Sequence, residues 1–107
     1  MTTVKKMQND VKSLVDKINS KHNHSKPELI SFMKIVEEVG EITQVLLKNQ
    51  INSRKSAKLS KNEVKDELGN EISDCIISLL ALANDFDIDI STFIVDKLNI
   101  HCERNSN

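Results

Sequence analysis

The chain contains no tryptophan and no tyrosine, and its three aromatic residues are all phenylalanine. Leucine, isoleucine and valine must therefore supply most of the apolar surface that folding buries, and self-association is a natural way to add more. An excess of charge of one sign is also lacking, since the formal net charge is −1. Proteins that bind nucleic acid usually carry a basic face, so we expect no nucleic-acid partner.

An apolar run is also lacking in residues 1–6, so we expect no secretory leader. The two cysteines, Cys75 and Cys102, have no CxxC spacing, and we expect free thiols in a reducing compartment rather than a disulfide. The cytoplasm is the expected location. The longest apolar stretch, near residues 75–83, is far shorter than a membrane span, so we expect no membrane partner.

Length and composition indicate one folded domain. The 107 residues are 38% apolar and 29% charged, which is typical of a chain that folds rather than stays disordered. We expect a single domain over residues 1–107. Its N-terminal helix and a connection would occupy residues 1–24, and the helices that bear the motifs would occupy residues 25–104.

Apolar residues recur at spacings of three and four in the first part of the chain, which is the period of an amphipathic helix. They are Val4, Met7, Val11, Leu14 and Ile18. They predict a first helix that ends near residues 19–20 and faces the core with this stripe. Two heptads are too few for a coiled coil. Residues 21–26 are predicted to be a polar connection.

A helix-start pattern follows the connection. Ser25 supplies a capping hydroxyl, Pro27 suits an early helical position, and Glu28 lies three residues after the cap. A second helix is therefore predicted to run to about residue 50. Residues 49–59 lack helical apolar periodicity, and we interpret them as a loop. A solvated linker is the favoured role for this loop, and an arm that contacts phosphate is the alternative.

A third and a fourth helix complete the prediction. Ser60 and Glu63 have the spacing of a capping box, so a third helix should begin there and continue to residue 83. Residues 84–89 should break it, and Asp89 can cap a fourth helix that ends near residue 104. The fold class is therefore all-α, a bundle of four to five helices that we expect to assemble as an oligomer.

Two acidic clusters on separate predicted helices are the strongest indication of function. They are Glu37-Glu38-Val39-Gly40-Glu41 and Glu71-Ile72-Ser73-Asp74. Carboxylates three residues apart on a helix point to one side. Two such pairs facing each other make an oxygen-rich pocket of the kind that holds Mg²⁺ together with water and substrate phosphates. We therefore hypothesise a divalent metal site that acts on a phosphate ester or anhydride.

A solvated helix face is the competing interpretation, because acids on a helix usually lie on its wet side. Against it, Glu38 and Glu41 flank an apolar stripe on the predicted second helix. Ile30 and Val45 also fall among the acids, where a purely solvated face would not need them. The stripe consists of Leu29, Met33, Val36, Val39 and Leu46.

Covered surroundings are also expected for the second cluster. Glu71 and Asp74 come directly before residues 75–83, which are almost entirely apolar. A helix that is apolar all round is usually buried. Asp74 should therefore lie partly covered, where an unpaired charge is costly. Gly40 costs about 1 kcal/mol relative to alanine in a helix interior. We expect it to allow another helix to approach closely.

Three side chains share one face of the predicted fourth helix. Lys97, His101 and Arg104 are spaced four and three apart, so they can neutralise phosphate oxygens. The alternative is a solvated cationic helix end, which the helix dipole favours. His22 and His24 lie in the predicted polar connection and are interpreted as surface residues.

The two acidic motifs resemble those of the all-α nucleoside triphosphate pyrophosphohydrolases of the MazG type. That family has EExxE followed, after a variable loop, by ExxD on the next helix. The similar sequence segments in this chain include EEVGEI, ELGNEISDCIISLLALANDFDID and VDKLNIHCER. The resemblance spans residues 27–104. The family also has KxxxNxxR in its fourth helix. Lys97 and Arg104 match that pattern, while His101 stands where asparagine is usual.

The resemblance implies an activity and a set of site residues. Members hydrolyse nucleoside triphosphates to the monophosphate and pyrophosphate with Mg²⁺, for which Mn²⁺ can substitute, and a homodimer or homotetramer is expected. Either Glu38 or Glu41 would accept the proton of the attacking water. The metal ligands would be Glu38, Glu41, Glu71 and Asp74, and the substrate contacts would be Lys97, His101 and Arg104. Glu37 matches the first acid of the family motif.

Other functions stay open at this point. A phosphoribosyl-ATP pyrophosphohydrolase has similar acidic helices and cleaves the same kind of bond. A di-iron carboxylate bundle is less favoured, because such a site uses Glu-x-x-His pairs and neither Glu38 nor Glu71 has a histidine three residues later. A helical binding or regulatory module without catalysis would explain the clusters as ordinary surface acids.

Overall fold

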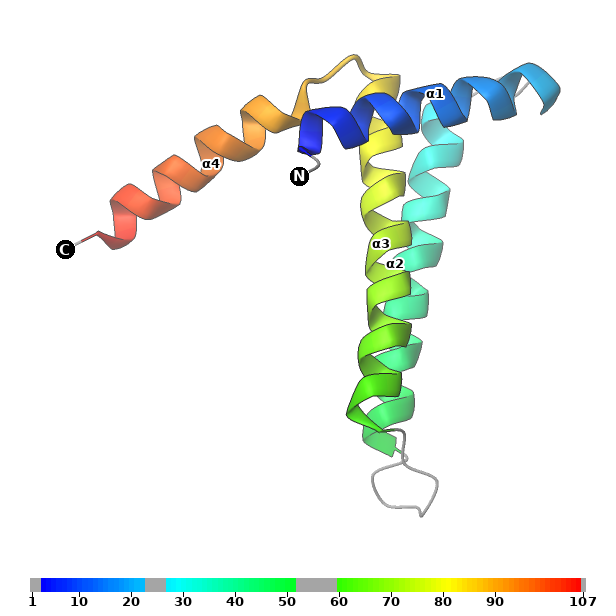
Figure 1. Cartoon of the computed structure of the whole chain (residues 1–107), viewed down its shortest axis with the longest axis vertical. Coiled ribbons are helices and arrows are strands. Elements are labelled where there is room, and N and C mark those ends of the chain that lie inside the picture. The colour runs from blue at the N-terminus through cyan, green and yellow to red at the C-terminus, as the bar shows by residue number, and fades with distance from the viewer. Residues whose placement is uncertain (1–2, 23–26, 52–59, 107) are drawn as a thin grey trace. The chain divides into compact units, whose positions relative to one another are not determined.

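The computed structural model describes residues 3–22, 27–51 and 60–106 of the chain. They form four helices and no strand: α1 (Val4–His22), α2 (Pro27–Ile51), α3 (Lys61–Asp85) and α4 (Ile90–Asn105) (Figure 1). The predicted all-α class is therefore confirmed for this part of the chain. Ser25, His24 and most of the predicted loop lie outside it. No described helix is both long enough and apolar enough to span a membrane.

The chain divides into two compact units, and α3 contributes to both. Unit 1 consists of Met1–Glu28 and Leu80–Asn107, and unit 2 consists of Leu29–Leu79. Unit 1 thus combines α1 and α4 with the last turns of α3. Unit 2 pairs α2 with the greater part of α3, and both acidic motifs belong to it.

Ser60 and Glu63 form the predicted capping box at the start of α3. The N–H of Glu63 donates to Ser60 Oγ at 3.1 Å, and the N–H of Ser60 donates to Glu63 Oε1 at 3.2 Å. This reciprocal pair satisfies donors that the start of a helix leaves without intrahelical partners. The prediction that α3 begins here is confirmed.

The other end of α3 closes in a Schellman motif. The N–H of Ile88 donates to the carbonyl of Ala83 at 2.9 Å, and the N–H of Asp87 donates to that of Asn84 at 3.1 Å. Asp87 has φ 55°, a left-handed conformation that aspartate tolerates better than most residues. This turn sets where α4 can begin.

Asp89 occupies the predicted N-cap position of α4, but its side chain does not cap the backbone. It accepts instead from the Thr92 hydroxyl at 3.2 Å and lies 3.6 Å from the Lys5 ammonium. The N–H of Ile90 donates to Gln8 Oε1 at 3.3 Å. The predicted capping by Asp89 is therefore wrong, because an amide from α1 satisfies a donor at this helix start.

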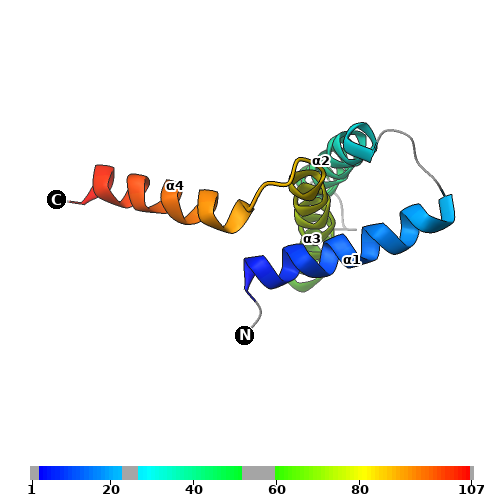
Figure 2. The same cartoon turned by 90° about the horizontal axis from the view of Figure 1, so that it is seen from above.

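Gln8 ties α1 to the corner between α3 and α4. It is only 4% exposed, and its Nε2 donates to Asn84 Oδ1 at 2.9 Å and to the Ile88 carbonyl at 2.6 Å. Asn84 Nδ2 donates back to the Gln8 carbonyl at 3.0 Å. The first turns of α1 lie beside the start of α4 in both views (Figures 1 and 2). Gln8 is therefore a polar clamp within unit 1.

The apolar core of unit 1 is small. Val11, Leu80 and Ala81 are buried together, and Val4, Val15 and Ile90 pack against them. The predicted core stripe of α1 is only partly covered, since Leu14 remains 52% exposed. No described residue of α4 is buried.

Unit 2 is an antiparallel pair of helices (Figure 1). Glu38 and Val45 are buried residues of α2, and Glu41 on the same helix is half-buried. The predicted apolar stripe lies on the outside, with exposed fractions from 45% to 61%. Its members are Leu29, Met33, Val36, Val39 and Leu46.

Two packing expectations are wrong for the single chain. Asp74 is exposed, and Ile76, Ile77 and Leu79 beyond it are 44–48% exposed, so this part of α3 is not covered on all sides. A Cβ added at Gly40 would meet nothing within 4 Å. No other part of the described chain therefore uses this glycine for close approach.

Gln8→Ala should destabilise the protein by about 2 kcal/mol, because it removes partly buried hydrogen bonds to the Ile88 carbonyl and the Ile90 N–H. Urea unfolding followed by circular dichroism measures this change. Asn9→Ala, on the neighbouring exposed position, is the control and should change the free energy of unfolding by less than about 0.5 kcal/mol. Equal free energies of unfolding for Gln8→Ala and the unmodified chain would contradict the stabilising role of Gln8.

Candidate metal centre

Carboxylates from α2 and α3 gather around Glu38 in unit 2. Oxygens of Glu37, Glu38 and Glu41 lie within 4.8 Å of one another, and so do oxygens of Glu38, Glu71 and Asp74. Positions three and four apart share a helix face, so each motif presents its acids together. The structure thus brings together the four residues predicted to be metal ligands, and their binding of a metal stays a prediction.

Glu38 is the most deeply buried of these acids, at 2% exposure. Its Oε1 lies 3.1 Å from the Lys34 ammonium, while its Oε2 is buried and has no hydrogen-bond partner in the described part of the chain. Glu71 Oε2 is likewise buried and unpartnered there. Removing a carboxylate from water costs several kcal/mol unless a partner replaces the water.

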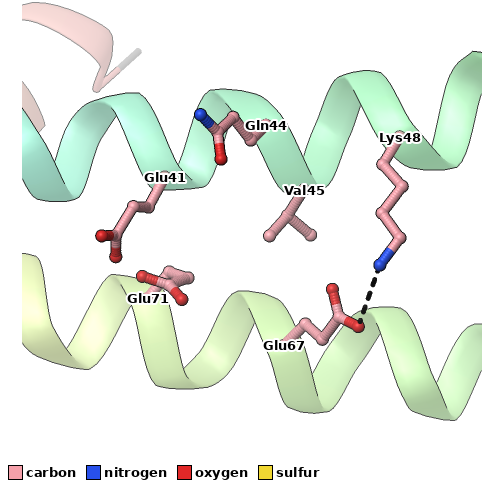
Figure 3. Close-up of a pocket in the computed structure, with 6 residues that line it drawn as sticks. All are labelled: Glu41, Gln44, Val45, Lys48, Glu67 and Glu71. Carbon is pink, nitrogen blue, oxygen red and sulfur yellow. Dashed lines mark ion pairs between the residues drawn. The ribbon is translucent and has the colours of Figure 1, made fainter.

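Glu41 faces Glu71 across the space between the two helices (Figure 3). When protonated, Glu41 donates a hydrogen bond to the Glu71 carboxylate, and this bond raises the pKa of Glu41 from 4.5 to about 7. Burial and the negative charge of Glu38 add to the rise. Glu41 therefore loses its proton less readily than an isolated carboxyl does.

Lys34 supplies positive charge at one side of the cluster. Its ammonium donates to Glu38, and this bond, together with the charge of Glu37 at 3.6 Å, raises the pKa of Lys34 above its usual 10.5. Lys34 lies one helical turn before Glu38, the i,i+4 spacing at which opposite charges attract. That spacing was a usable sequence signal, although Lys34 was not among the predicted site residues.

A hollow of about 400 Å³ adjoins the acids, with Glu41 and Glu71 in its wall. The ammonium of Lys48 lies 3.8 Å from Glu67 Oε1 at its far side (Figure 3). Gln44 and the buried Val45 complete the lining. Glu41 and Glu71 were predicted site residues. The sequence did not predict the other lining residues, because a cavity depends on how two helices pack.

The donor set suits a hard cation. Both groups of neighbouring ligand atoms consist of carboxylate oxygens alone, the donors that Mg²⁺ and Mn²⁺ accept. The buried oxygens of Glu38 and Glu71, which have no partner among the residues that the structure describes, are where a cation would replace lost water. The residues present therefore fit a divalent metal.

Lys97, His101 and Arg104 lie on α4 in unit 1, and all three side chains are exposed. Their spacing places them on one face of that helix, as the sequence predicts. Their contact with a substrate stays a prediction.

Comparisons with known protein families and with curated proteins find no match for this chain. The donor set and the geometry of the carboxylate cluster carry the functional proposal.

Without a bound cation, the free energy of unfolding should fall as pH rises from about 5 to 8. The folded chain holds the Glu41 proton up to about pH 7, whereas an unperturbed carboxyl loses it near 4.5. The folded state thus binds more protons between these values, so the stability present below pH 4.5 is lost as pH rises through about 7. Urea unfolding in EDTA at a series of pH values measures the slope.

Glu41→Gln should flatten this pH profile, because the amide does not titrate. Asp66→Asn, which removes an exposed carboxylate from α3, is the control and should keep the original slope. A profile for Glu41→Gln as steep as that of the unmodified chain would show that another group is responsible.

Proposed function

We propose that this chain is a Mg²⁺-dependent hydrolase that converts ribo- or deoxyribonucleoside triphosphates to the monophosphate and pyrophosphate, as part of nucleotide-pool housekeeping. The observation that carries the proposal is a pair of buried oxygens, on Glu38 and Glu71, that have no hydrogen-bond partner among the described residues and lie within a cluster of carboxylates. The EExxE and ExxD motifs add the resemblance to the MazG-type pyrophosphohydrolases. Glu38, Glu41, Glu71 and Asp74 would hold the metal.

The reaction breaks the bond between the bridging oxygen and phosphorus at the link between the α- and β-phosphates, and water adds to phosphorus. When bound, Mg²⁺ neutralises the charge of the phosphate oxygens and orients the attacking water. Glu41 is the better candidate to accept the water proton, because it borders the hollow. Glu38 is only 2% exposed and is held by Lys34.

The hollow beside Glu41 and Glu71 is the proposed place for part of the substrate. Its volume of about 400 Å³ falls within the range of small-molecule sites, roughly 300–1,000 Å³. Lys48 offers an ammonium for an anionic group at its far side, since its pair with Glu67 is long at 3.8 Å. Lys97, His101 and Arg104 are the proposed further contacts to phosphate or sugar.

We further propose that the active form is a homodimer or homotetramer, in which helices of several copies complete the bundle. Val45 is the one apolar side chain of unit 2 that is buried, among those that the structure describes. The apolar stripe that includes Met33 and Val36 stays exposed. Large exposed apolar surfaces are unusual on monomers and mark interaction sites, and Gly40 on α2 leaves room for a close neighbour.

Purified protein with MgCl₂ should release pyrophosphate from at least one member of a panel of natural and damaged nucleoside triphosphates. Glu38→Gln and Asp74→Asn should each lower the rate at least about 100-fold, because each removes a ligand charge that the metal needs. Asp66→Asn should keep the activity. Pyrophosphate and monophosphate are both quantified to confirm the bond that is cleaved.

The same panel separates the rival functions. Including phosphoribosyl-ATP tests the related hydrolase, which would cleave that substrate in preference to the others. Mg²⁺-dependent nucleotide binding without pyrophosphate release would favour a regulatory module. Unchanged activity in Glu38→Gln would overturn the assignment of the site.

Light scattering coupled to gel filtration should give the mass of a dimer or tetramer. Val36→Asp should shift the protein toward monomer and lower its melting temperature, because it places a charge in the proposed interface. Asn9→Asp, an exposed change on α1, is the matched control and should leave the mass unchanged. A monomer mass for the unmodified chain at micromolar concentration would contradict the proposed assembly.

A further inference from the structure

Lys34 pairs with one oxygen of the buried Glu38 carboxylate. Its ammonium lies 3.1 Å from Glu38 Oε1 and 3.6 Å from Glu37 Oε1. The side chain of Lys34 is 53% exposed, whereas that of Glu38 is 3% exposed. The ammonium thus reaches the buried acid from the solvent side, and Glu38 Oε2 stays without a partner in the described part of the chain.

A divalent cation and the Lys34 ammonium would attract the same carboxylate. Two cations bound to one carboxylate lie only a few ångström apart, and their repulsion is screened little beside a buried group. An ammonium is a point charge on a flexible four-carbon stem, and half of the Lys34 side chain already contacts solvent. Lys34 can therefore leave Glu38 without any movement of the helix.

We propose that Lys34 is a built-in counter-ion that competes with a divalent cation for Glu38 and so sets the cation affinity of this centre. This inference rests on the proposed function, because it takes the acids to be metal ligands. In the metal-free protein Lys34 offsets the charge of Glu38. In the metal-loaded protein the ammonium turns to solvent. Breaking the ion pair between Lys34 and Glu38 therefore makes the net free energy of cation binding less favourable.

Lys48 is a matched comparison on the same helix. Its side chain is 54% exposed and pairs with Glu67 at 3.8 Å, but Glu67 belongs to neither group of neighbouring ligand atoms. Replacing Lys48 therefore removes one positive charge near the site without releasing a ligand. Direct competition predicts an effect at Lys34 that Lys48 does not share.

The test is a titration with Mn²⁺ alone, without nucleotide, in which electron paramagnetic resonance measures the free ion. Lys34→Met should bind Mn²⁺ about fivefold to tenfold more tightly than the unmodified chain, the effect of losing a competing ion pair with one buried partner. Lys48→Met should stay within about twofold. Metal-free Lys34→Met should melt at a lower temperature, and saturating Mn²⁺ should restore the loss.

Each outcome bears on a distinct claim. Equal or weaker Mn²⁺ binding by Lys34→Met, with clear binding by the unmodified chain, overturns the role of Lys34 and leaves the proposed function standing. The same tightening in Lys48→Met also overturns it, because the effect would then be general electrostatics. Absence of Mn²⁺ binding in every variant overturns both claims.

Lys34→Gln provides a second variant in case Lys34→Met does not fold without metal. Glutamine keeps a hydrogen-bond donor for Glu38 but removes the charge. It should also bind Mn²⁺ more tightly than the unmodified chain, whereas Lys34→Arg, which keeps the charge, should not. Equal affinities for the glutamine and arginine variants would overturn the proposal.

Discussion

Carboxylates of like charge gather around the buried Glu38 between α2 and α3, and the other features of the site depend on that electrostatic cost. Glu38 is 2% exposed, and both it and Glu71 keep a buried oxygen without a partner in the described part of the chain. Protonation of Glu41 and the ammonium of Lys34 relieve part of the repulsion. A divalent cation would relieve it more fully, because it offers two charges where water is excluded.

The residues of α2 that lie outside the carboxylate cluster include exposed apolar side chains. Side chains such as Met33, Val36 and Leu46 are 45–61% exposed. These side chains gain little from the hydrophobic effect in the single chain. Association with further copies would bury those side chains, so the proposed metal centre and the proposed assembly have one physical origin.

Local interactions made most of the fold predictable. The capping box of Ser60 and Glu63 involves residues three apart, and the acidic spacing placed each cluster on one helix face. The support of Ile90 by Gln8 joins residues far apart in the chain, which no local pattern reveals. The exposure of Asp74 was missed because its apolar surroundings on α3 are uncovered in the single chain.

The central claim is that the buried acids form a metal centre. Diffraction data collected at the manganese absorption edge, from crystals grown with Mn²⁺, test it most directly. The account predicts an anomalous peak in contact with the carboxylates of Glu38 and Glu71, at a bond length of about 2.1 Å if the site is as compact as one for Mg²⁺. No peak there, with Glu38 still paired to Lys34, would contradict it.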